Sequence, residues 1–295
     1  MALILLNPPV AEPVSLAELK EFCRVDSSDT SQDGVITTLA MAARSWAEVY
    51  TGRRFVQQTW RLLLDFFPGY VDMKAAGQRV SSPFVSGANA LLVGIRYAFA
   101  LPYPPVQSIV SFQYQNANGQ VTTMTLNTDY IADLQSNPAR LTPPFGQVWP
   151  VARIVINAIN VDYQVGYAMP VVVTTTASSA AVVSSGYTFQ ATDIGRPISI
   201  PGAGLNGGAL NTVIAAITSP PTSAATLRDA AALAVTNGTG LLVNNPNGNP
   251  SHWEMAKAGI KMLVEHWYEN RIPDENNIPQ QVKSVLSPLR DLRIN

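Results

Sequence analysis

The apolar positions between residues 33 and 54 recur at intervals of three and four, which predicts an amphipathic helix. One apolar stripe on this helix consists of Ile36, Leu39, Ala40, Ala43, Ala47 and Tyr50. A second stripe beside it consists of Val35, Ala42, Trp46 and Val49. We expect Asp33 to cap the first turn and Gly52 to end the helix in a left-handed conformation. Each of the two apolar stripes has to be buried against other residues. We expect the chain itself to bury one stripe and a neighbouring copy of the chain to bury the other.

Helical patterns also occur near both ends of the chain. In residues 14–25, Ser15 and Glu18 have the spacing of a capping box. Residues 251–271 place one apolar face on a helix that Pro273 ends. That face consists of Met255, Ala258, Gly259, Met262, Leu263 and His266.

Between the helical segments, short runs of β-branched and aromatic residues predict strands. Those before residue 170 are 55–67, 91–97, 109–114, 121–126, 130–134, 140–142 and 153–165. The turn sequence at residues 116–119 predicts a hairpin between the third and fourth of them. Two helices followed by short antiparallel strands indicate an α+β fold with a small helical bundle.

The composition changes near Pro170. Residues 171–250 contain four charged residues, and β-branched runs recur there between turn residues. These runs are 171–176, 198–200, 212–217 and 241–243, whereas 226–235 fits a strand or a helical piece equally. We predict an all-β, sandwich-like module at residues 170–250. It is inserted into a discontinuous domain of residues 1–169 and 251–295.

The overall composition narrows the class of protein. Of the 295 residues, 47% are hydrophobic and 13% charged, with a net charge of −1, which provides no basic footprint for nucleic acid. Cys23 is the single cysteine, so no intrachain disulfide forms. The first residues lack a basic leader, and no apolar run reaches the length of a membrane span. We expect a soluble protein made in a cytoplasm, with no membrane partner.

The chemical motifs favour structural interpretations. Residues 202–207 spell GxGxxG, but Pro201 precedes them and no helical pattern follows, so we expect a glycine-rich turn. Cys23, His252 and His266 are too few for a three-histidine metal site, and we expect a buried inert thiol at Cys23 and a core histidine at His266. Arg53 and Arg54 fit a helix C-terminus, with phosphate contact as the alternative. We therefore expect no enzyme activity, no cofactor and no metal.

Several segments occur in an order that is familiar. They are VSLAELKEFCRVD (14–26), WAEVYTGRRFVQQTW (46–60), DYIADLQSNPARLTPPFGQVWP (129–150), VDYQVGYA (161–168), GIKMLVEHWYENR (259–271) and VKSVLSPLR (282–290). Together they resemble the head–tail connector (adaptor) proteins of tailed bacteriophages. The resemblance covers residues 14–168 and 251–293.

This resemblance implies a structural subunit of the virion neck, assembled in the host bacterial cytoplasm. It implies a homo-oligomeric ring, expected to be twelve-fold, beneath the portal protein. DNA would pass through the ring without sequence-specific binding, and a downstream neck or tail protein would dock below. Trp46, Val49 and Arg53 would lie in the contact between subunits. The portal-docking tail would use Val282, Val285, Leu286, Leu289 and Arg290, with folding of that tail onto its own helices as the alternative.

The module at 170–250 departs from the family pattern, in which the strand ending near Tyr167 leads almost directly to the last helix. Three roles are possible for this module: it decorates the outside of the neck, it binds a collar or fibre component, or it braces adjacent subunits. The alternative function is a carbohydrate- or receptor-binding protein that reads its ligand through this module. Tyr187 and Phe189 are its only aromatic residues.

Overall fold

The computed structural model describes residues 1–68, 98–244, 251–271 and 277–290, and these fall into two compact units. The sheet unit contains the described residues of 1–8 and 58–166. The barrel–helix unit contains those of 9–57 and 167–290. The predicted strand at 91–97 lies outside the described residues. The expected α+β class is confirmed.

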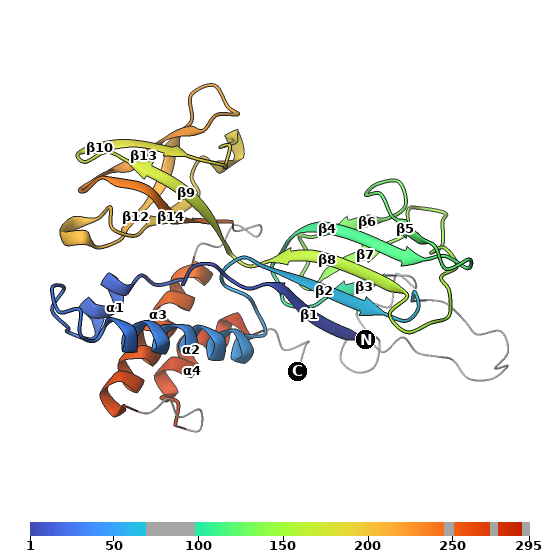
Figure 1. Cartoon of the computed structure of the whole chain (residues 1–295), viewed down its shortest axis with the longest axis horizontal. Helices are drawn as coiled ribbons and strands as arrows, with labels where there is room; N and C mark the ends of the chain where they lie inside the picture. The colour runs from blue at the N-terminus through green and yellow to red at the C-terminus, as the bar shows by residue number, and fades with distance from the viewer. Residues whose placement is uncertain (69–97, 245–250, 272–276, 291–295) are drawn as a thin grey trace. The chain divides into compact units, whose positions relative to one another are not determined.

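The sheet unit holds a five-stranded antiparallel sheet and a three-stranded antiparallel sheet (Figure 1). The larger sheet has the order β1 (Ala2–Asn7), β2 (Gln58–Leu64), β8 (Ile159–Val165), β4 (Val106–Gln115) and β5 (Val121–Thr123). The smaller has the order β3 (Phe99–Leu101), β7 (Ala139–Thr142) and β6 (Ile131–Asp133). β4 and β5 form the predicted hairpin, in which Gln115 pairs with Val121.

The core of the sheet unit follows from the two-residue period of its strands. In β8 the side chains at alternate positions, from Ile159 to Val165, are fully buried. Aromatic rings fill the space beside them. Trp149 stacks on Phe67 with ring centroids 4.9 Å apart, and Phe112 packs edge-on against Trp149.

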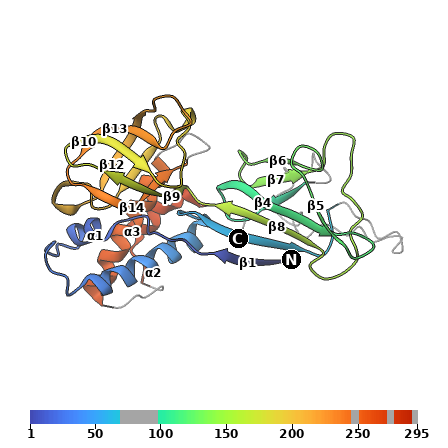
Figure 2. The same ribbon diagram turned by 45° about the horizontal axis from the view of Figure 1, so that its top comes forward.

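The charge-poor segment forms a six-stranded closed barrel (Figure 2). Around the barrel the order is β10 (Ser179–Ser184), β13 (Ala224–Ala231), β12 (Leu210–Ala216), β11 (Pro197–Ile200), β14 (Val235–Val243) and β9 (Ala168–Thr175). The all-β prediction is confirmed, although the strands close into a barrel and not into a sandwich. Closure gives every strand two neighbours, which removes exposed sheet edges. The ambiguous segment at 226–235 contributes to strand β13.

Four α-helices make up the rest of the described barrel–helix unit: α1 (Leu16–Phe22), α2 (Asp33–Thr51), α3 (Ser251–Asn270) and α4 (Gln280–Leu286). The capping box of Ser15 and Glu18 is confirmed, and Gly52 ends α2 with a φ of 69°. The expectation for Asp33 was wrong. Gln32 is the N-cap of α2, and the Asp33 carboxylate lies 2.9 Å from the ammonium of Lys20.

Barrel residues also contribute to the helical core. Leu241 and Val243, at the end of β14, are buried in the same apolar cluster as Trp253 and Ile260 of α3. On the polar side, Lys257 of α3 binds both Glu18 of α1 and Asn211 of β12, at 2.9 and 3.2 Å. Whether residues 170–250 fold autonomously stays a prediction. In the described residues, no helix is long and apolar enough to span a membrane.

Candidate assembly interface

The first apolar stripe of α2 is covered by its own chain, but the second is only partly covered. Ile36, Ala43 and Ala47 are fully buried. The second stripe, named the α2 stripe here, consists of Val35, Ala42, Trp46 and Val49. Val49 is 70% exposed and Val35 is also exposed.

Trp46 is half-buried and stacks on Tyr50, with centroids 5.0 Å apart and planes 11° from parallel. Stacking on Tyr50 holds the indole of Trp46 in place in the absence of a partner. The α2 stripe is therefore a rigid, uncharged surface, as a contact between copies requires, although its use as an interface stays a prediction.

Arg53 has partners within its own chain. Its Nε donates to the carbonyl of Leu289, and its Nη1 donates to the hydroxyl of Tyr167 at 2.9 Å. Arg53 thus ties the end of α2 to the C-terminal tail and to the start of the barrel. Its predicted role between subunits stays untested.

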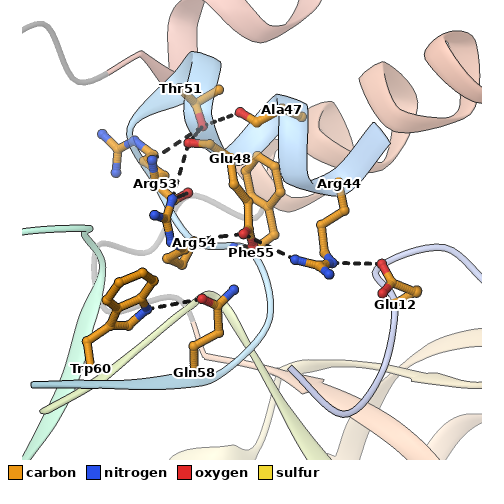
Figure 3. Close-up of polar contacts among 10 residues, drawn as sticks. All are labelled: Glu12, Arg44, Ala47, Glu48, Thr51, Arg53, Arg54, Phe55, Gln58 and Trp60. Carbon is orange, nitrogen blue, oxygen red and sulfur yellow. Dashed lines mark hydrogen bonds and ion pairs between the residues drawn. The ribbon is translucent and has the colours of Figure 1, made fainter. Parts of the chain in front are cut away.

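A buried carboxylate fixes the end of α2 (Figure 3). Glu48 accepts the backbone N–H of Phe55 at 3.0 Å, and its other oxygen lies 3.3 Å from Arg44 Nη1. Arg44 in turn binds Glu12 at 2.8 Å. Arg54 donates to the carbonyl of Glu48, which agrees with the prediction of a cation at the helix C-terminus.

The C-terminal tail folds back on its own helices, the alternative left open by the sequence. Val282, Leu286 and Leu289 are fully buried in the helical core. The predicted role of these three side chains in docking on a portal stays a prediction. Val285 is half-buried and Arg290 is exposed, so these two remain available. The guanidinium carbon of Arg290 lies 5.0 Å from the ring centre of Tyr50.

Cys23 and His266, the remaining candidate residues, have surroundings that fit a structural role. His266 is half-buried, and its Nε2 lies 2.9 Å from the carbonyl oxygen of Asn277, so the core-histidine prediction was wrong. Burial, with the charges of Glu265 and Glu269, raises the pKa of the Cys23 thiol to about 11, which keeps it protonated at neutral pH. In the described residues, no three His, Cys, Asp or Glu side chains are grouped to hold a metal ion.

The glycine-rich sequence lies between two antiparallel barrel strands. Residues Leu205–Gly207 form a short 3-10 turn that connects β11 to β12. A dinucleotide fingerprint needs a strand followed by a helix. The prediction of a glycine-rich turn is confirmed.

The sequence reasoning missed a second exposed apolar surface, in the loop that leads into β8. Phe145 is fully exposed, and Ile154 and Ile156 are 80% and 82% exposed. Val148 and Val151 of the same loop are also exposed, and these five residues are named the apolar tip here. The sequence prediction placed residues 153–158 in a strand, but β8 begins at Ile159.

Comparisons with known proteins give structural matches only. No protein-family model and no curated protein matches the chain. A chain from the neck of an empty gene transfer agent (GTA) particle, solved with C6 symmetry, is similar at a TM-score of 0.51 and 12% identity. A chain from the virion of a native GTA particle is similar at a TM-score of 0.52 and 12% identity. Each match covers 100% of this chain and 98% of the other.

The protein shares the fold of a particle-neck chain. Because both matches span the barrel as well as the helices and the sheets, the shared fold includes residues 170–250. At this identity, the likeness concerns the fold alone.

Proposed function

We propose that the protein is a structural subunit of the neck of a tailed, phage-like particle, where it forms a ring that connects the head to the tail. The observation that carries this proposal is the match over the full length to a chain of a GTA neck. The resemblance of six sequence segments to phage connector proteins is a second line of support, since it rests on sequence and not on the structural match. Those segments lie in α1, α2, the sheets and the C-terminal helices.

The surface of the chain fits an assembly role. The α2 stripe is apolar, uncharged and ordered by stacking, and a closed ring needs such surfaces on each copy. We infer a ring of copies, twelve by resemblance, with DNA in its channel, the portal on one side and a downstream neck protein on the other. Portal docking is assigned to the outward side of the tail, which includes Val285 and Arg290.

Carbohydrate recognition through the barrel has little support from the side chains. Phe189 is fully buried, and Tyr187 donates to the carboxylate of Asp193 at 2.9 Å. Burial and this bond raise the pKa of Tyr187 to about 12. Sugar-binding sites usually present an exposed aromatic face, whereas Phe189 is fully buried and Tyr187 is half-buried.

Electron microscopy of particles tests the proposal. Particles that carry the protein with a small tag inserted after Asn206, in the exposed turn of the barrel, should show extra density in a ring below the portal. Untagged particles are the control. Density at the tail tip or on the capsid shell would overturn the neck assignment.

A further inference from the structure

The apolar tip is held at one end of the five-stranded sheet. In that sheet Ile159 pairs with Leu64 on one side and with Tyr114 on the other, so β8 begins where β2 and β4 end. The loop that carries the tip runs into this point. Its Asn157 N–H donates to the Asp65 carboxylate at 2.8 Å, and its Arg153 N–H donates to the Gln115 carbonyl at 2.9 Å.

A buried ring anchors the middle of the loop. Trp149 is 7% exposed and stacks on Phe67 with planes 8° apart. The loop is therefore fastened at its centre and near its end, while the five tip side chains extend into solvent. A surface ordered before binding loses less conformational entropy when a partner covers it.

The exposed area lies at the upper end of the range that free monomers show. Apolar patches above a few hundred Å² on a soluble protein usually mark an interaction site. The five side chains expose on the order of 600 Å² of apolar surface, close to the ~800 Å² that each partner contributes to a standard interface. The apolar tip is thus large enough to form most of one side of a stable contact.

Because the apolar tip carries almost no charge, it fits an uncharged, apolar surface on its partner. Arg153 is the only charged residue between 143 and 158, so the tip has no charge pattern for nucleic acid or a strongly acidic protein. The α2 stripe is also uncharged and apolar, and Val35 and Val49 of this stripe are exposed. The apolar tip and the α2 stripe lie on different elements of one chain. In a ring, each copy contacts the next through two different surfaces, so a chain that forms a ring needs two complementary patches. Strand β1 also exposes apolar residues, but Ile4, Leu5 and Leu6 are each less than half exposed.

We propose that the apolar tip of one copy packs on the α2 stripe of the next copy. This inference rests on the proposed function, since it assigns the two halves of the contact that builds the ring. The partner of the tip is a second copy of this chain.

Charge substitution tests the tip. The full-length double variant I154K/I156K should fold as the wild type does, because both side chains are exposed, and circular dichroism and thermal melting check this. In analytical ultracentrifugation over a concentration series, wild-type protein should associate and the variant should remain at the 31.7 kDa monomer mass. L205K is the matched control, since Leu205 is 81% exposed on the barrel, and it should associate as the wild type does.

A mixing experiment tests the pairing itself. V49K should also be monomeric alone, because Val49 lies on the α2 stripe. A mixture of V49K with I154K/I156K retains one intact tip and one intact stripe, so it should form heterodimers and nothing larger. If the tip instead contacted another protein, I154K/I156K would assemble normally.

The outcomes separate this inference from the proposed function. Normal assembly of I154K/I156K, absence of heterodimers in the mixture, or a wild type that stays monomeric at every concentration would each overturn the pairing. Particle location is a separate measurement. Rings that form through the tip but are absent from particle necks would overturn the proposed function and leave the pairing intact.

Discussion

At the residue scale, Glu18 joins three elements. One carboxylate oxygen accepts the N–H and hydroxyl of Ser15 at 3.0 and 2.9 Å, closing the cap of α1. The other lies 2.9 Å from Lys257 and 3.2 Å from the amide of Asn211. Burial opposes ionisation of Glu18, but the charge of Lys257 and the bond from Ser15 outweigh it and lower the pKa to about 2.

This pKa predicts acid sensitivity. Because the folded-state pKa lies below the unfolded value of about 4.3, ionised Glu18 stabilises the fold above that pH, and the gain is lost as pH falls toward 2. The effect is worth about 3 kcal/mol at most. Urea unfolding between pH 7 and pH 2 should therefore show a shallower acid-side loss for E18Q than for wild type. E21Q, at an exposed position of the same helix, is the control, and equal slopes for E18Q and wild type would contradict the prediction.

At the element scale, the tail depends on a close approach between α3 and α4. Gly259 makes this approach possible, since a Cβ there would lie 2.6 Å from a methyl of Leu286. We expect L286A to lower the free energy of unfolding by about 2–4 kcal/mol, because Leu286 is fully buried. V285A, at the half-buried neighbour, should lower it by less than about 1 kcal/mol. Urea unfolding compares them, and equal losses would mean that the tail does not pack as described.

Local patterns predicted some elements and could not predict others. The capping box at Ser15 and the left-handed Gly52 depend on residues within one turn, so the sequence contained all the information needed. The burial of Leu286 depends on a glycine in another helix, and barrel closure depends on the pairing of β9 with β14, more than sixty residues apart. The apolar tip was missed because a buried indole, not a local period, sets which side chains face out. Trp46 and Val49 lie on one stripe of α2 as predicted, and the contact of this stripe with another copy of the chain stays a prediction.

At the scale of the whole molecule, the barrel and the helices share contacts. Replacing residues 170–250 with a Gly/Ser linker should leave a soluble protein with its helical circular dichroism. Loop-closure entropy changes little with length, so a fall in stability would report lost contacts. We expect such a fall, of about 1.5–3 kcal/mol for each of Leu241 and Val243. An unchanged free energy of unfolding would show that these contacts contribute nothing, and an insoluble product would show that the module belongs to the core.

The pairing of Ala168 with Val243 has a consequence for how this protein can change. The barrel leaves and rejoins the chain at two neighbouring positions, about 5 Å apart in an antiparallel pair. The barrel is therefore attached to the rest of the chain through two adjacent strand ends, as a hairpin loop is attached through its two strands. A foreign domain whose own termini are adjacent can be grafted onto the same stem, and a ring of copies would then display that cargo at regular intervals around a particle.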